Sequence, residues 1–438
     1  MSVESLKQIL QRLAPSGSFQ SNVLTLLSGT VLAQALPVLV SPLLTRLYDP
    51  ADFGIFALYS SISALMAVVA TGRYELAVML PKEHEDAASI CVLSVCLAVC
   101  VGGLTLAVMA GFGTELAQLF RSNEIWPWLF LVPLSVVMSG FNQTVVYWCN
   151  RRGKYHFLAQ GGVLQAVTVA AISLMAGYVN GGAAGLIVAS VTGMFVYGVF
   201  LGYVEFPWNA VRLGMTASGR LRHLALEYRD MPLFSTMEAF VGMAALQLPL
   251  FFMTAYYSVS TAGQYSLAYK VVLLPTGMIG SAIGQVFYQR FTSSLMTSED
   301  SSKLLKKTWL TLSAIALVPS LTLFFFAPKL FSLFFGASWQ EAGEIASYLS
   351  VLMFMSFVFS STSFSHVALR IQHISLAFAV ASLVFKAVII FFCYKLSASF
   401  YSMMFLIVMY ETIQIMAMNG IALRKTKLMS LGARVPAS

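Results

Sequence analysis

Twelve apolar stretches divide this chain, and they constrain its fold more than any other feature of the sequence. Each is about 20 residues long or longer, the length of helix that crosses a hydrocarbon core about 30 Å thick. They are residues 22–45, 53–74, 88–112, 125–148, 156–178, 182–203, 231–255, 263–289, 309–327, 344–368, 374–394 and 400–422. Only 10% of all residues are charged, against about 25% in a soluble domain. The sequence therefore predicts an all-α integral membrane protein with twelve transmembrane helices.

The distribution of Lys and Arg predicts the orientation of these spans, because positive residues accumulate in cytoplasmic segments. With the N-terminus in the cytoplasm, cytoplasmic segments hold 20 of the 26 Lys and Arg residues. The opposite side holds four, which are Arg46, Arg121, Lys329 and Lys395. Both termini are therefore expected in the cytoplasm. The basic residues are divided among seven short segments, so the net charge of +8 does not indicate a nucleic-acid partner.

A weak internal repeat divides the chain into two halves. A shift of 209 positions aligns Tyr48 with Tyr257 and Gly54 with Gly263, at the turn between the first two spans of each half. Two six-helix lobes of one orientation are therefore expected, as in transporters built from parallel repeats. The predicted segments are a cytoplasmic N-terminal segment with an interfacial helix (1–21), an N-terminal lobe (22–204), a cytoplasmic linker (205–230), a C-terminal lobe (231–422) and a basic cytoplasmic tail (423–438).

Ionisable residues inside the second-half spans are candidate functional residues, because a charge within a bilayer is costly and usually faces a partner or a wet cavity. Glu238 and Lys270 lie in the opening pair of spans of that half, and Lys386 and Glu411 in its closing pair. Opposite signs on neighbouring helices predict ion pairs. The sequence leaves two roles open, a neutralising salt bridge or a coupling function within a cavity.

A further charged group ends the second span. An apolar run, 76–80, follows Arg73 and Glu75, so the helix is expected to continue past Arg73 and to line a vestibule. Residues two apart point in different directions on a helix, so Glu75 is not expected to neutralise Arg73 on one helix face. The alternative role of Arg73 is an interface anchor. Arg46 is the corresponding cation at the outer end of the first span, where a snorkelling anchor is the simpler interpretation.

Polar and aromatic residues within the spans are candidate sugar contacts, namely Tyr59, Asn142 and Gln247. Ordinary interhelical hydrogen bonds are the alternative for each. The sequence contains none of the spacings typical of a zinc site, a P-loop or a Gly-rich dinucleotide site. We therefore expect no metal, no cofactor and no enzymatic activity, with transport driven by a gradient or a partner.

The segment Thr45–Ala87, TRLYDPADFGIFALYSSISALMAVVATGRYELAVMLPKEHEDA, resembles the N-terminal signature of Wzx-type flippases, in the polysaccharide-transporter branch of the MOP superfamily. The resemblance implies a MATE-like pair of lobes in the bacterial inner membrane, alternating access and a cationic central cavity. It implies an undecaprenyl-pyrophosphate-linked oligosaccharide as substrate, for O-antigen, capsule or exopolysaccharide biosynthesis. Membrane lipids and polysaccharide polymerase or assembly proteins are the implied partners. Arg73, which lies within GRYELA, is the implied pyrophosphate-binding cation. Lys270, by its place in the opening pair of spans of the second half, and Arg46 are the further candidate cations.

Two alternatives to a flippase remain at this point. A cation-coupled multidrug exporter of MATE type would share the helix number and the repeat. A membrane polysaccharide polymerase or ligase would share the composition, but such enzymes usually work through a large periplasmic loop. The outer connections expected here are short, the longest being 113–124 or 328–343.

Overall fold

The computed structural model describes residues 19–208, 218–296, 301–369 and 372–430, and the regular elements in these ranges are helices. Two compact units are present. Unit 1 comprises Met1–Leu47 and Tyr59–Phe240, and unit 2 comprises Tyr48–Leu58 and Val241–Ser438. Most of the predicted interfacial helix falls on residues 1–18, outside the described part of the chain. The predicted lobe boundaries stay predictions.

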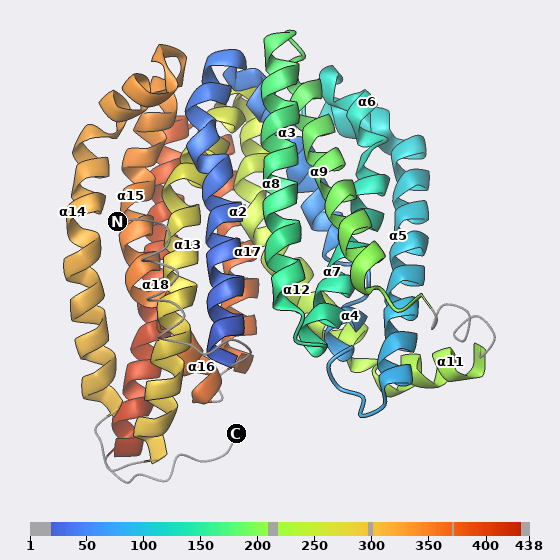
Figure 1. The fold of residues 1–438 in the computed structure, drawn as a ribbon. Helices are drawn as coiled ribbons and strands as arrows, with labels where there is room; N and C mark the ends of the chain where they lie inside the picture. The colour runs from blue at the N-terminus through green and yellow to red at the C-terminus, as the bar shows by residue number, and fades with distance from the viewer. Residues whose placement is uncertain (1–18, 209–217, 297–300, 370–371, 431–438) are drawn as a thin grey trace, which may run out of the picture. The chain divides into compact units, whose positions relative to one another are not determined.

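Unit 1 is a row of long helices with short elements at its ends. The elements are α2 (Phe19–Leu47), the second part of α3 (Pro50–Ala67), α4 (Tyr74–Ala77), α5 (His84–Leu119), η1 (Asn123–Ile125), α6 (Trp126–Leu129), α7 (Val132–Arg151), α8 (Tyr155–Tyr178), α9 (Gly182–Glu205), α11 (Ser218–Glu227), η2 (Met231–Ser235) and the start of α12 (Thr236–Phe252). Helix α2 packs on α8, α8 on α9, α9 on α7 and α7 on α5. Figure 1 shows these five helices side by side in that order.

Unit 2 is arranged around α15. Its elements are the first part of α3, the rest of α12, η3 (Met253–Tyr257), α13 (Val259–Met296), α14 (Ser301–Phe335), η4 (Ala337–Trp339), α15 (Gln340–Ser360), α16 (Phe364–Ala368), α17 (Gln372–Lys395) and α18 (Phe400–Ser430). Helices α13, α14 and α18 all pack against α15, and α17 packs on α18.

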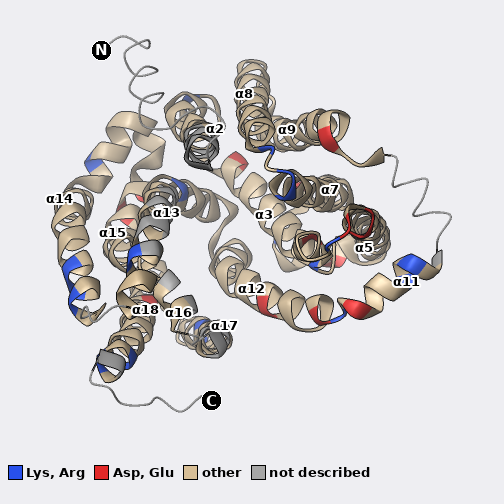
Figure 2. Cartoon of the chain, turned by 60° about the horizontal axis from the view of Figure 1, so that its bottom comes forward, with Lys and Arg blue, Asp and Glu red and all other residues tan. Residues whose placement is uncertain are grey.

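Most of these helices are long and apolar enough to cross a membrane. In the described residues nine helices meet that condition, or ten if the bent pair Asn123–Leu129 and Val132–Arg151 is one span, and Val31–Leu47 is a shorter apolar helix. Helix α13 is not among them, and it carries Gln264, Lys270 and Arg290. Figure 2 shows how sparse charged residues are along the long helices and that α11 carries both signs. The protein is therefore a multi-pass membrane protein, and the number of twelve spans stays a prediction.

Proline residues affect these helices in two ways. Helix α2 continues through Pro37 and Pro42, and α13 continues through Pro275. Pro133 instead lies at the start of α7, where the chain bends by 48° from the preceding helical segment. A proline is tolerated in the first turn of a helix because the N–H that it lacks has no partner there.

The internal repeat is visible as a reciprocal contact between the starts of α3 and α13, both within unit 2. A Cβ added to Gly54 would lie 1.8 Å from the carbonyl oxygen of Val259, and one added to Gly263 would lie 1.9 Å from that of Pro50. The 209-residue shift relates Gly54 to Gly263 and Pro50 to Val259. A two-fold relation between the two helix starts produces such a reciprocal pair of contacts. Glycine is required at both positions because backbone approaches backbone.

Candidate functional site

The chain around Arg73 is a broken helix. Helix α3 ends at Ala67. After it, the N–H groups of Val69, Ala70, Gly72 and Tyr74 each donate to the carbonyl oxygen three residues earlier, as in successive turns. Gly72 and Arg73 have φ values of 56° and 61°, in the left-handed region. The prediction that the helix continues past Arg73 is therefore wrong. A non-glycine residue in this conformation costs roughly 1–2 kcal/mol, so neighbouring contacts must hold it.

Hydrogen bonds from distant helices fix this segment. Arg151, the last residue of α7, donates from Nη1 to the carbonyl oxygen of Val78 at 3.0 Å and from Nη2 to that of Pro81 at 2.7 Å. The Tyr74 hydroxyl donates to the carbonyl oxygen of Ala225, on α11, at 2.7 Å. The segment is thus anchored to α7 and α11, which explains how the strained backbone persists.

The broken helix also brings Arg73 and Glu75 together. The Glu75 side chain is only 2% exposed; its carboxylate accepts a hydrogen bond from the Thr71 hydroxyl and lies 3.5 Å from Nη1 of Arg73. The expectation that Glu75 would not neutralise Arg73 is therefore wrong, because it assumed a regular helix. The Arg73 side chain remains 29% exposed, and its buried Nε has no hydrogen-bond partner among the described residues.

The other predicted pyrophosphate cations lie in different surroundings. Lys270 is half-buried on α13 in unit 2, and no ion pair joins it to another described residue of that unit. Arg46 is exposed in the last turn of α2. Glu238 is exposed in the first turn of α12 and belongs to unit 1. Its pairing with Lys270 stays a prediction.

The structure brings Lys386 and Glu411 together in unit 2. Their side chains, on α17 and α18, form an ion pair with exposed fractions of 5% and 22%. Nζ of Lys386 also donates to the carbonyl oxygen of Ala245, on α12, at 3.1 Å. A buried ion pair needs such additional hydrogen bonds to offset the desolvation of its charges.

Two of the three candidate sugar contacts are engaged in interhelical hydrogen bonds. The Tyr59 hydroxyl lies 2.6 Å from the Ser135 Oγ, and the Asn142 amide donates to the carbonyl oxygen of Met194 at 3.0 Å. Gln247 is half-buried on α12. A role in sugar binding stays a prediction for all three.

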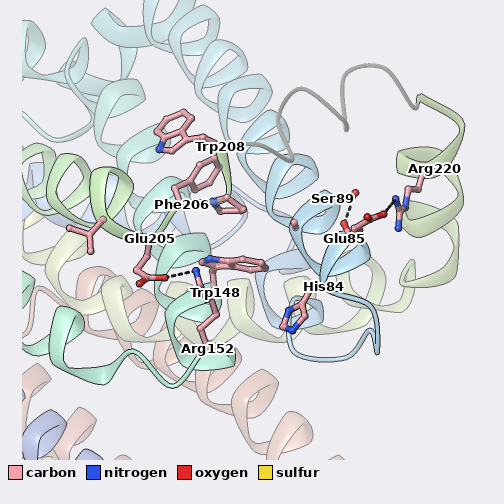
Figure 3. Close-up of a pocket in the computed structure, with 12 residues that line it drawn as sticks. His84, Glu85, Ser89, Trp148, Arg152, Glu205, Phe206, Trp208 and Arg220 are labelled. Atoms are coloured by element: carbon pink, nitrogen blue, oxygen red, sulfur yellow. Dashed lines mark hydrogen bonds and ion pairs between the residues drawn. The ribbon is translucent and has the colours of Figure 1, made fainter.

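Sequence reasoning missed a polar pocket in unit 1, shown in Figure 3. It has a volume of about 520 Å³ and lies where α5 begins and α7 and α9 end. Arg152 donates from Nη1 to Glu205 at 2.8 Å on one side, beside the Trp148 ring. Phe206 and Trp208 add aromatic walls. In the sequence, the motif Glu-Phe-Pro-Trp at 205–208, directly after the sixth span, marks this pocket, but the prediction places these residues in the polar linker.

Helix α11 borders this pocket. Arg220 donates to Glu85 at 2.9 Å and to Asp86 at 2.7 Å, at the start of α5. The hydrogen bonds to Glu85 and then Asp86 raise the pKa of Arg220 above its ordinary value. The guanidinium is therefore charged at every physiological pH and ties α11 to α5.

Residues 43–344 match the profile of a family described as polysaccharide biosynthesis protein, which is about two thirds of the chain. The chain belongs to this polysaccharide biosynthesis family. The matched region contains the whole segment 45–87 and continues far beyond it. The resemblance to the Wzx-type flippases of the MOP superfamily is thereby confirmed, and the fold supports it.

Solved structures of MOP transporters share the fold of this family member. The lipid II flippase MurJ, in an inward closed conformation, has a TM-score of 0.67 and 11% identity over 94% of this chain and 90% of its own. An inward-facing multidrug resistance MATE family transporter has a TM-score of 0.61 and 15% identity, over 93% of this chain and 95% of its own. A MOP superfamily transporter from Pyrococcus furiosus has a TM-score of 0.53 and 15% identity, over 96% of this chain and 98% of its own. Among curated proteins, none matches this chain. At such identities these likenesses establish the fold alone.

Proposed function

We propose that this protein is a flippase for a lipid-linked oligosaccharide. It moves undecaprenyl-pyrophosphate-linked repeat units from the cytoplasmic to the outer leaflet of a bacterial inner membrane, for O-antigen, capsule or exopolysaccharide biosynthesis. Twelve spans, cytoplasmic termini and alternating access belong to the same proposal. Membership of the polysaccharide biosynthesis family carries it. The fold shared with a lipid flippase and with other MOP transporters supports it.

Arg73 is the proposed contact for the pyrophosphate. An anion that leaves water for a protein cavity needs a nearby cation, since an unpaired buried charge is very costly. A guanidinium has five N–H donors and binds phosphate oxygens in a bidentate manner. Among the described residues, Arg73 makes one long side-chain contact, to Glu75 at 3.5 Å, and it is partly exposed, so most of its N–H donors are available to a ligand. Lys270 and Arg46 are the further cations of the proposal.

Complementation of a strain that lacks this gene tests the proposal. Arg73→Ala is expected to lower surface polysaccharide about tenfold or more, since a hydrogen bond to a charged group contributes about 1.5–3 kcal/mol. Undecaprenyl-linked repeat units should accumulate on the cytoplasmic leaflet. Lys329→Ala, at an exposed residue of α14, is the matched loss of a cation and should behave as wild type.

Two results would contradict different parts of this proposal. If Arg73→Ala and Lys270→Ala, at normal expression, each restored surface polysaccharide fully, the assigned roles of these cations would be wrong. If the deletion strain kept its surface polysaccharide but lost resistance to cationic drugs, the multidrug-exporter alternative would replace the flippase.

A further inference from the structure

An apolar groove lies beside the polar pocket of Figure 3, and both belong to unit 1. Their volumes are about 520 Å³ for the pocket and about 420 Å³ for the groove, each within the range of small-molecule sites. Trp208 lines both cavities. Its indole N–H donates to the carbonyl oxygen of Gly202 at 2.7 Å, which fixes the ring at the junction. The pocket and the groove therefore adjoin at Trp208.

The groove has the chemistry of a hydrocarbon-binding surface. It runs between α7 and α9, where Gly198 and Gly202 lack side chains and Phe141 forms a wall. Phe195 and Val199 are 51% and 54% exposed although they lie in the interior of an apolar helix. Such side chains in a membrane-spanning segment contact lipid chains rather than water.

The pocket is formed by residues at the ends of apolar helices, where lipid headgroups are expected. Glu205 is the last residue of α9, Arg152 directly follows α7, and His84 and Glu85 begin α5. Charged and aromatic side chains gather where membrane helices end, at the interface with water. A lipid with its chain in the groove would thus place its headgroup in the pocket.

The arginines of the pocket are neutralised. Arg152 pairs with Glu205, and Arg220 pairs with both Glu85 and Asp86, so the carboxylates outnumber the arginines. Each pair still has unused N–H donors and carboxylate lone pairs. The buried indole N–H of Trp148 has no partner among the described residues, and its ring lies beside the Arg152–Glu205 pair in Figure 3. A ligand group with one negative and one positive centre fits this arrangement better than a purely anionic group.

We propose that the pocket and the groove together bind one phosphatidylethanolamine-type phospholipid, whose headgroup contains a phosphate and a primary ammonium. The phosphate oxygens accept hydrogen bonds from Arg152 and Trp148, the ammonium donates to Glu205 beside them, and an acyl chain passes Trp208 into the groove. A pyrophosphate-linked saccharide fits less well, because the carboxylates already neutralise both arginines. This site is independent of Arg73 and does not rest on the proposed flippase activity.

Native mass spectrometry of the purified full-length protein tests the site. The probes are phosphatidylethanolamine and phosphatidylglycerol with identical acyl chains. We expect phosphatidylethanolamine to bind about tenfold more tightly or better. Val199→Trp fills the groove and should weaken that binding about tenfold. Val188→Trp makes the same change at an exposed position of α9 outside the groove and should leave binding unchanged.

A charge variant tests the headgroup assignment separately. Glu205→Gln frees Arg152 from its partner, so the preference should move toward phosphatidylglycerol. Val199→Trp, at an exposed position, tests the site even if Glu205→Gln does not fold. The proposal is overturned if the wild type binds phosphatidylglycerol equally well, or if Val199→Trp leaves phosphatidylethanolamine binding intact. Displacement by equimolar undecaprenyl-pyrophosphate-linked N-acetylglucosamine would also overturn it and would assign the site to the transported lipid.

Discussion

At the residue scale, the conformation of Arg73 decides what its side chain can do. In a regular helix Arg73 and Glu75 would point in different directions. The left-handed backbone at Gly72 and Arg73 turns the chain so that the carboxylate meets the guanidinium at 3.5 Å. Strained residues of this kind cluster at functional sites, so the outlier itself supports a role for Arg73 beyond a membrane anchor.

The Lys386–Glu411 pair allows a residue-scale test of the two roles that the sequence left open. Lys386→Met should destabilise the protein by roughly 3–5 kcal/mol, because it leaves Glu411 without its buried partner. The double variant Lys386→Met with Glu411→Leu should recover most of that loss, since an apolar pair of similar volume is often as stable as the ions. Thermal unfolding in detergent measures both variants.

Transport by the same double variant separates neutralisation from coupling. We expect it to restore surface polysaccharide in the gene-deleted strain, as a neutralising salt bridge requires. A double variant that is as stable as wild type but inactive would instead assign a coupling role to the pair.

At the scale of elements, the starts of α3 and α13 are in close backbone contact. At the start of α3, the Asp52 carboxylate accepts a hydrogen bond from the Asp49 N–H at 3.1 Å. At the start of α13, the Ser258 Oγ accepts one from the Thr261 N–H at 2.9 Å. Side-chain caps of this kind satisfy backbone N–H groups near a helix start and fix where it begins. The two glycines then let the helices cross in backbone contact.

Gly263→Ala tests this crossing. The new Cβ would lie 1.9 Å from the Pro50 carbonyl oxygen, a backbone atom that cannot move aside as a flexible side chain can. We expect a loss of about 1–3 kcal/mol, typical of overpacking, or misfolding of the variant. Gly277→Ala is the matched control on the same helix, because nothing lies within 4 Å of its added Cβ. Equal thermal stability of the two variants would contradict the crossing.

At the scale of the whole molecule, the long helices have the fold of MOP transporters, and the distribution of charge predicts their orientation. The boundaries of the two units fall within α3 and α12, so each of these helices contributes to both units. The proposed cytoplasmic location of both termini rests on the 20 Lys and Arg residues of the expected cytoplasmic segments. That part of the architecture is open to a direct experiment.

Single-cysteine labelling in whole cells tests the orientation, after the five native cysteines have been replaced. Asn180→Cys and Ser397→Cys lie in exposed turns on the expected outer side and should react with a membrane-impermeant maleimide. Lys82→Cys, exposed before α5, should react only after permeabilisation. The reverse pattern would invert the topology and reopen the polymerase or ligase alternative.

The sequence by itself determined the membrane class, the positions of most long helices, the family and the pairing of Lys386 with Glu411. These features depend on local properties. A run of about 20 apolar residues must span a bilayer as a helix whatever its neighbours are, and a charge buried in such a span needs a partner or a wet cavity. The repeat was also detectable, because a glycine at the same place in each half marks a close approach.

Only the tertiary structure decided where Arg73 points and that a polar pocket lies beside an apolar groove. The break after Ala67 has no strong local signal, since it is held by Arg151 and by the carbonyl group of Ala225, both far away in the chain. The pocket likewise collects His84, Trp148 and Glu205 from three helices. Residues so distant in sequence meet only after the helices have packed, so no pattern along the chain specifies the site that they form.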